Sequence, residues 1–244
     1  MATLESLGVN KKTARIAGAL YLIVVVTGFF SMIHVPSQIV VPGDASATVA
    51  NILASEPLFR LGIVAGLLCH TVFLLLPFAL YRLLSPVGRD VAVLMVAFAV
   101  ASVPVSFVNL FNKLDILSLL DGADHLQGFA TEQLHAQVML SLDAYGNGLL
   151  VSEIFWGLWL LPFGYLVFRS GFLPRVLGIL LMTGCFGYLI NFSGKLFFPG
   201  YGETNIAALV SLPSGLGEIG TCLWLLIVGI REAKGGVVST RNAA

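Results

Sequence analysis

The amino-acid sequence predicts an all-α, polytopic membrane protein with six transmembrane helices. Composition is the first observation: 57% of the residues are hydrophobic and 11% are charged, against about 25% charged in ordinary soluble domains. The second is a set of six apolar segments, because a helix needs about 20 apolar residues to cross the hydrocarbon core. These segments cover residues 16–33, 58–84, 91–111, 145–168, 176–193 and 206–230.

The first apolar segment follows three basic residues, Lys11, Lys12 and Arg15, and so begins like a signal peptide. We expect it to stay as a span, because it is long and no small-x-small cleavage site follows it. The second and third segments are joined by a short turn over 85–90, and the fourth and fifth by another over 169–175. Both turns contain glycine or proline, so each predicts a tight hairpin between neighbouring spans.

Lysine and arginine residues near the spans predict the orientation, since cytoplasmic loops carry an excess of both. If the N-terminus is cytoplasmic, ten of the 13 basic residues lie on that side and three do not: Arg60, Lys113 and Lys195. We therefore expect residues 1–15 and 231–244 to be cytoplasmic and 16–230 to form one membrane domain. The expected location is the bacterial cytoplasmic (inner) membrane, with the lipid bilayer as partner.

The two longer outer connections are acidic and each predicts a helix at the membrane interface. One covers residues 46–55, with Asp44 or Ser46 placed to cap its N-terminus. The other begins near Thr131 and carries apolar residues on one stripe, namely Leu134, Val138 and Leu142.

Parts of the chain resemble one another. The fourth and sixth segments share the pattern E-I-x-x-x-L-W-L-L, which begins at Glu153 and at Glu218. The third and fifth segments both end near an Asn-x-x-x-Lys pattern. These matches predict three repeated helical hairpins, made of spans 1–2, 3–4 and 5–6 and inserted in the same direction. Chance likeness among helices rich in Leu, Trp and Gly is the alternative.

Glu153 and Glu218 are the acidic residues that lie inside the apolar segments, and they are the first candidates for function. A charged side chain at that depth costs at least a few kcal/mol. Each carboxyl group should therefore be neutral or paired with a cation, and should face the interior of the bundle. Binding, proton transfer or catalysis is one role for them, and hydrogen bonding that only ties helices together is the other.

The Asn-x-x-x-Lys patterns are Asn109 with Lys113 and Asn191 with Lys195. A spacing of four places the amide and the ammonium group on one helix face. Both pairs are candidates to line a common vestibule that opens outward. Each lysine alone is as well explained by a side chain that extends to the lipid headgroups.

His70 and Trp156 complete the set of candidate binding residues. His70 lies within the second segment, and haem ligation would require a second histidine inside the membrane. The other histidines lie at a span end or in an outer loop, so we expect a core or pocket residue and no haem. Trp156 follows Glu153 by about one helical turn and is a candidate for lining the same pocket.

The sixth segment contains a proline and three glycines between Leu212 and Gly220. This composition favours a weakened or broken helix beside Glu218, which membrane proteins tolerate where the backbone lines a cavity. A glycine-rich face for close helix packing is the alternative.

Several function classes have no support in the sequence. The three cysteines lie in apolar segments without metal-ligand spacing, so we expect no metal site. Nucleotide-binding and hydrolase motifs are absent from the sequence, and we expect no cofactor. Nucleic-acid binding is not expected either, because no basic face exists outside the membrane flanks.

The stretch Glu153–Phe192 contains FWGLWLLPFGYLVFRSGFLPRVLGILL. It resembles the bacterial membrane family known as domain of unknown function 4386, and the likeness covers about residues 10–232. The resemblance implies an integral membrane protein with six spans, and it implies no particular activity.

The leading hypothesis is a protein that binds or transports a small molecule through an outward-facing polar pocket with two buried carboxylates. Two alternatives stay open at this point. One is a cofactor-free intramembrane enzyme that uses the carboxylates as acid and base on a lipid or isoprenoid. The other is a structural or partner-binding subunit, whose contact surface would be the acidic outer loops. Catalytic residues and oligomeric state are not predicted.

Overall fold

The computed structural model describes residues 4–122 and 128–230, and the regular elements it describes are all helices. The predicted cytoplasmic tail, residues 231–244, lies outside the described residues. Helices η1 and η4 are π-helical and η3 is a 3₁₀ turn. In chain order the elements are α1 (Leu4–Phe29), η1 (Phe30–His34), α2 (Val35–Ile39), α3 (Ala45–Ala54), α4 (Glu56–Leu84), α5 (Arg89–Leu120), α6 (Thr131–Ser170), α7 (Arg175–Phe197), η3 (Tyr201–Glu203), α8 (Asn205–Leu223) and η4 (Trp224–Val228).

Six helical segments of the described chain are long and apolar enough to cross a membrane, which confirms the predicted all-α class with six such helices. The first joins α1, η1 and α2 over Lys11–Ile39, and the last joins α8 and η4 over Asn205–Val228. Large apolar side chains such as Val108, Phe186 and Leu209 are exposed, as expected of a surface that faces lipid. By helix length and hydropathy the chain is a multi-pass membrane protein.

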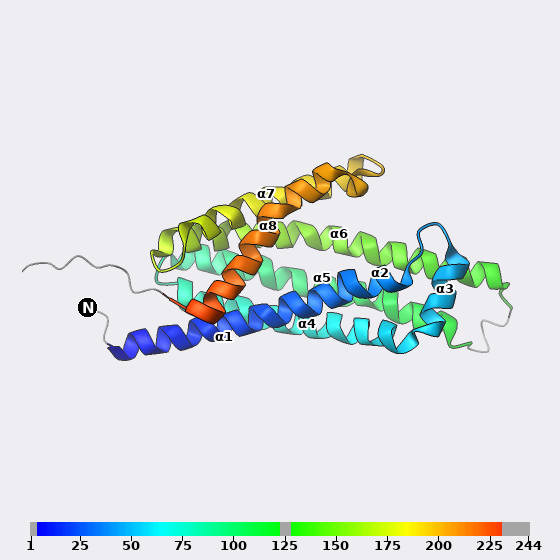
Figure 1. Cartoon of the computed structure of the whole chain (residues 1–244), viewed down its shortest axis with the longest axis horizontal. Coiled ribbons are helices and arrows are strands. Elements are labelled where there is room, and N and C mark those ends of the chain that lie inside the picture. The colour runs from blue at the N-terminus through cyan, green and yellow to red at the C-terminus, as the bar shows by residue number, and fades with distance from the viewer. Residues whose placement is uncertain (1–3, 123–127, 231–244) are drawn as a thin grey trace, which may run out of the picture.

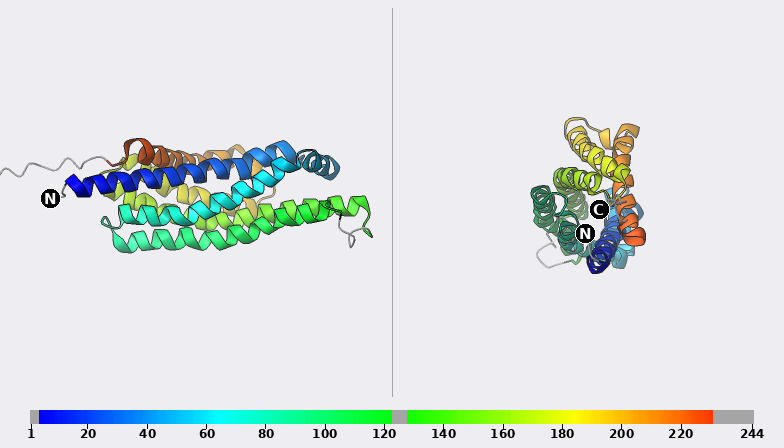
Figure 2. Two further views of the ribbon diagram at one scale, coloured as in Figure 1. Left: turned by 90° about the horizontal axis from the view of Figure 1, so that it is seen from below. Right: turned by 90° about the vertical axis from the view of Figure 1, so that its left-hand side faces the viewer.

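The spans form a closed ring in which each packs against its neighbour in sequence. Helix α1 packs on α4, α4 on α5, α5 on α6, α6 on α7 and α7 on α8. Helix α8 then crosses obliquely to the N-terminal half of α1 (Figure 1), where η4 packs against α1 and closes the ring. The end-on view in Figure 2 shows the helices grouped around a common interior.

The interior is filled by two clusters of buried apolar side chains. The larger one lies where all six spans meet, and its largest members include Tyr21, Leu76, Met95, Trp159 and Phe163. The smaller one lies at the end of the bundle that α3 covers, which we call the α3 end. It joins α2, α3, α4, α5 and α6 through Ile39, Ile52, Phe59, Ile116 and Val138.

One predicted interfacial helix is confirmed as a helix, and the other is wrong as a separate element. Helix α3 begins after Asp44, whose Oδ1 accepts a hydrogen bond from the amide of Ala47 at 2.8 Å. The helix expected near Thr131 does begin there, but it continues without a break into the fourth span. The resulting α6 has 40 residues and is about 60 Å long at 1.5 Å per residue. With α5 it forms a hairpin that reaches the α3 end (Figure 2).

The expected break in the sixth span is also wrong. Helix α8 continues through Pro213 and past Glu218 to Leu223. The small residues serve close packing instead: a Cβ atom on Gly184 of α7 would lie 2.7 Å from the Cα of Ser214, and one on Gly217 would lie 3.0 Å from the amide nitrogen of Leu181. Small residues at such positions let membrane helices approach closely, and this contact between α7 and α8 holds Glu218 toward the interior.

Candidate functional site

A cavity of about 180 Å³ lies inside the ring, between α1, α4, α6, α7 and α8. Five of its twelve lining residues are Phe, Trp or Tyr. The polar groups that reach it come from different helices, and they are the hydroxyls of Tyr21 and Tyr188, the imidazole of His70 and the carboxylate of Glu218. We call this space the central cavity.

Glu218 is held by two tyrosine hydroxyls that come from other spans. Tyr21 on α1 donates to Oε2 at 3.1 Å, and Tyr188 on α7 donates to Oε1 at 3.3 Å. Within the described chain the carboxylate has no ion-pair partner. Of the two predicted alternatives, pairing with a cation does not apply to Glu218 within the described chain. Each oxygen of its carboxyl group instead lies within hydrogen-bond distance of one neutral hydroxyl.

His70 lies on α4 and is 3% exposed. Its ring stacks on Trp156 with centroids 6.4 Å apart and meets the edge of Phe107 at 6.2 Å. Neither ring nitrogen has a hydrogen-bond partner among the residues the structure describes. The imidazole thus lines the central cavity between two aromatic rings, without a hydrogen bond to the described chain.

The aromatic wall follows from helical spacing on α6. Trp156, Trp159 and Phe163 are separated by three and four residues, so their side chains lie along one face of the helix. Trp159 and Phe163 are stacked with centroids 5.1 Å apart. Phe73 of α4 meets Trp159 edge-on at 5.2 Å. This packing fixes the rings in place and so keeps the shape of the central cavity.

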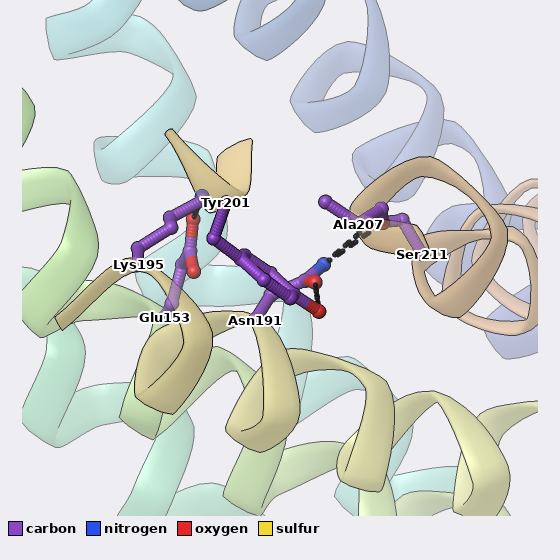
Figure 3. A network of polar contacts seen from close by, with 6 residues as sticks. All are labelled: Glu153, Asn191, Lys195, Tyr201, Ala207 and Ser211. Atoms are coloured by element: carbon purple, nitrogen blue, oxygen red, sulfur yellow. Dashed lines mark hydrogen bonds and ion pairs between the residues drawn. The ribbon is translucent and has the colours of Figure 1, made fainter. Parts of the chain in front are cut away.

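Glu153 lies outside the central cavity and is paired with Lys195. Their Oε1 and Nζ atoms are 2.6 Å apart, and the side chains are 15% and 38% exposed (Figure 3). The second carboxylate oxygen of Glu153 is buried without a hydrogen-bond partner in the described chain. Of the two alternatives predicted for this carboxylate, a neutral group or one paired with a cation, the structure has the cationic partner, and that partner is the candidate residue Lys195.

Asn191 belongs to a separate network that ties α7, η3 and α8 together (Figure 3). Its Nδ2 donates to Ser211 Oγ at 2.7 Å and to the carbonyl of Ala207 at 3.3 Å. Tyr201 donates to its Oδ1 at 3.0 Å. Both atoms of the amide thus bond to protein groups, and these bonds join α7 to η3 and α8.

Lys113 and Asn109 form a third neighbourhood, on α5. Lys113 is 3% exposed, and its Nζ donates to the carbonyl of Ser31 at 3.1 Å and lies 4.1 Å above the ring of Tyr145. Asn109 donates to the carbonyl of Tyr145 at 2.9 Å. Lys113 also lines a second cavity, of about 240 Å³, toward the α3 end.

The eight predicted site residues thus lie in three places. His70, Trp156 and Glu218 share the central cavity. The remaining five are divided between the α6–α7–α8 contacts of Figure 3 and the α5 neighbourhood. No group of three His, Cys, Asp or Glu residues in the described part of the chain is placed to hold a metal ion.

The profile of a family described as Domain of unknown function (DUF4386) matches residues 16–229. The chain belongs to this family. An uncharacterized protein from Archaeoglobus fulgidus is 28% identical over 162 residues, which is 66% of this chain and 78% of that protein. No solved structure matches this DUF4386 chain. Because neither description states an activity, the function has to be argued from the geometry of the site.

Two residues of this DUF4386 site were missed in the sequence, namely Tyr21 and Tyr188. Both lie in apolar segments, where a tyrosine is usually interpreted as a packing residue or an interfacial anchor. A usable signal was present for Tyr21, since it follows Ala14 and Ala17 at spacings that share one helix face. Such a face of small residues points to the bundle interior, and a hydroxyl there requires an acceptor.

Proposed function

We propose that this DUF4386 protein binds a small molecule in the central cavity and carries it across the membrane, with Glu218 as the main polar binding group. The observation that carries the proposal is the place of this carboxylate, which lines an aromatic cavity and is bonded to two tyrosine hydroxyls. An ionisable group inside a membrane is costly and marks a substrate or ion pathway by default. If the hydrogen bonds of Glu218 served only to join helices, no cavity would be needed beside this residue.

The polar groups of the cavity retain capacity for a ligand. A carboxylate has about four acceptor positions, and the described chain fills two of those of Glu218. His70 contributes two unbonded ring nitrogens from a different helix. A molecule in the cavity can therefore satisfy groups that the protein leaves unpaired, which favours binding over an empty site.

A route toward the α3 end supports transport. The second cavity, which Lys113 and Asp143 line, has one residue in common with the central cavity, and that residue is Met32. Methionine is unbranched and adapts its shape easily. We propose that Met32 separates an outward-facing chamber from the central cavity and moves aside when the ligand passes.

Protonation and deprotonation of Glu218 would drive the movement of the ligand along this route. The neutral acid and the carboxylate differ by one charge, and in a cavity with an apolar wall that difference changes the affinity for a ligand. A proton on Glu218 would weaken the binding of a positively charged ligand and its loss would strengthen it. Tyr21 and Tyr188 would keep the group oriented in both states.

The arrangement favours transport over acid/base catalysis by two carboxylates. Such an enzyme needs both groups at one substrate, whereas Glu153 does not line the central cavity and is paired with Lys195.

We also propose that both termini are cytoplasmic and that the protein lies in a bacterial cytoplasmic membrane. The distribution of basic residues supports this, because ten of the 13 lie on one side. Three repeated hairpins are supported by the packing of α1 on α4, α5 on α6 and α7 on α8.

Native mass spectrometry in mild detergent tests the binding role. The wild-type protein would be compared with Glu218→Gln, and Glu153→Gln serves as the matched control because it changes the other carboxylate in the same way. We expect a retained adduct, or a ligand-dependent rise in melting temperature in a screen of small amines, acids, sugars and lipids. Glu218→Gln should lose this response and Glu153→Gln should keep it. Equal responses in all three proteins, or no response in the wild type, would contradict the proposal.

A further inference from the structure

Aromatic rings line the central cavity from several sides. Tyr21, Phe73, Trp156, Trp159 and Tyr188 contribute rings from four helices. Ring contacts at 5.2 Å and 6.2 Å hold Phe73 and Tyr21 against Trp159. The face of an aromatic ring is the negative end of a quadrupole, so a cage of such rings attracts positive charge.

The cavity also holds a carboxylate that the protein leaves without a counter-ion. Glu153 is neutralised by Lys195 (Figure 3), and the exposed Glu56 is paired with Arg60. Glu218 receives two hydroxyl hydrogen bonds and no cation within the described chain. A carboxylate removed from water is stabilised far more by an opposite charge than by neutral donors alone.

From these two features we infer that the central cavity binds a small organic cation of the alkylammonium class, with its charge between Glu218 and the aromatic rings. The inference rests on the proposed function and names the class of its ligand. A volume of about 180 Å³ equals that of about six water molecules at ~30 Å³ each. A cavity of this volume accommodates a compact ammonium compound and is too small for a phospholipid.

Inorganic cations fit the same cavity poorly. Ca²⁺ takes about six to eight oxygen ligands, and Mg²⁺ requires an octahedral shell of oxygen atoms in which it usually keeps several waters. The described wall offers the carboxylate of Glu218 and the hydroxyls of Tyr21 and Tyr188, and the rest is aromatic and aliphatic carbon together with one imidazole and one thiol. Alkyl groups on an ammonium ion match such a wall, because they need no ligand oxygens and pack against rings.

His70 adds a position for a polar substituent on the cation. Its ring nitrogens are unbonded in the described chain, and its stacking on Trp156 places it at the wall that the aromatic residues form. A hydroxyl group on the ligand would satisfy one of these nitrogens. The cavity therefore suits a hydroxyalkyl ammonium better than a bare one.

Choline and 3,3-dimethylbutan-1-ol provide a matched pair of probes. They have the same shape and hydroxyl group, and differ in the nitrogen that carries the positive charge. Binding of each would be titrated by calorimetry and by tryptophan fluorescence on the detergent-purified full chain, in which two of the three tryptophans line the cavity. The proteins are the wild type, Glu218→Gln and the control Glu153→Gln.

We expect choline to bind the wild type and Glu153→Gln, and to bind Glu218→Gln at least about tenfold more weakly. The neutral isostere should bind the wild type at least about tenfold more weakly than choline, since it lacks attraction to both the carboxylate and the rings. Equal affinity of the two probes, with both lost in Glu218→Gln, would overturn the cation inference and leave the binding site intact. Absence of choline and tetramethylammonium binding at 10 mM, with another class of ligand retained by the wild type, would overturn it as well. If the wild-type protein responds to no ligand at all, the proposed function is contradicted as well.

Discussion

The ammonium group of Lys113 on α5 donates to the backbone carbonyl of Ser31 in η1, with Nζ and O 3.1 Å apart. The carbonyl is free because η1 is π-helical there: the amide of Val35 bonds to the carbonyl of Phe30, five residues back. The next amide along would belong to Pro36, which has no N–H. A local change in helix type thus creates the acceptor that a buried lysine uses.

Lys113→Met should therefore lower stability, although it removes a buried charge. The change leaves the Ser31 carbonyl unpaired, at a cost of about 1–3 kcal/mol, and ends the contact with the Tyr145 ring. The melting temperature in detergent would report it, with Lys12→Met near the N-terminus as control. A rise in melting temperature for Lys113→Met would mean that the desolvation of the ammonium group outweighs its hydrogen bond.

Substitution of Lys195 should lower the free energy of unfolding more than substitution of its partner Glu153. Lys195→Met leaves a largely buried carboxylate without its cation and should destabilise by about 2–3 kcal/mol. Glu153→Gln leaves a lysine that is 38% exposed and can turn to water, so its cost should be about 1 kcal/mol. The double variant completes a mutant cycle measured by thermal unfolding. Additive costs in that cycle would show that the ion pair contributes nothing to stability.

Two glycine-to-alanine changes should act in opposite directions. A Cβ on Gly178 would lie 2.6 Å from the amide nitrogen of Phe168 and 2.7 Å from the carbonyl of Gly164, so Gly178→Ala should force α6 and α7 apart at a cost of about 1–3 kcal/mol. Gly215→Ala is the matched control, since nothing lies within 4 Å of its added methyl. Alanine there should stabilise α8 by up to about 1 kcal/mol. Similar melting temperatures for the two variants would contradict the close packing.

The all-α class with six long apolar helices was predicted from hydropathy and is confirmed. The separate helix at Thr131 and the break beside Glu218 were predicted from local composition, and both are wrong. The length of α5 could not be predicted from hydropathy. This helix continues beyond Phe111, where the predicted third span ends, to Leu120, with Lys113 buried and Asp115 exposed. Polar residues therefore do not mark the end of the helix where a neighbouring helix covers them.

The types of residue at the candidate site could be predicted from the sequence, but which of these residues lie together could not. Glu153 and Glu218 each begin an E-I-x-x-x-L-W-L-L pattern, yet they have different partners. Glu153 pairs with Lys195 of α7, and Glu218 accepts from Tyr21 of α1 and Tyr188 of α7. The partner of Glu153 is 42 residues away in sequence, and no local pattern connects them. Pro213 likewise predicted a break, and tertiary packing against α7 outweighed that local preference.

The hydrogen bond from Tyr21 to Glu218 joins residues 197 positions apart, and it gives the site a place in the order of biosynthesis. Tyr21 lies on the first of the six described spans to be synthesised, and Glu218 lies on the last of these six. Until that last helix docks, the nascent chain has no finished pocket and the newly inserted carboxylate has no tyrosine donors. Completion of the proposed site therefore coincides with the docking of α8 against α1 and α7, and a chain that stalls before α8 would lack that site.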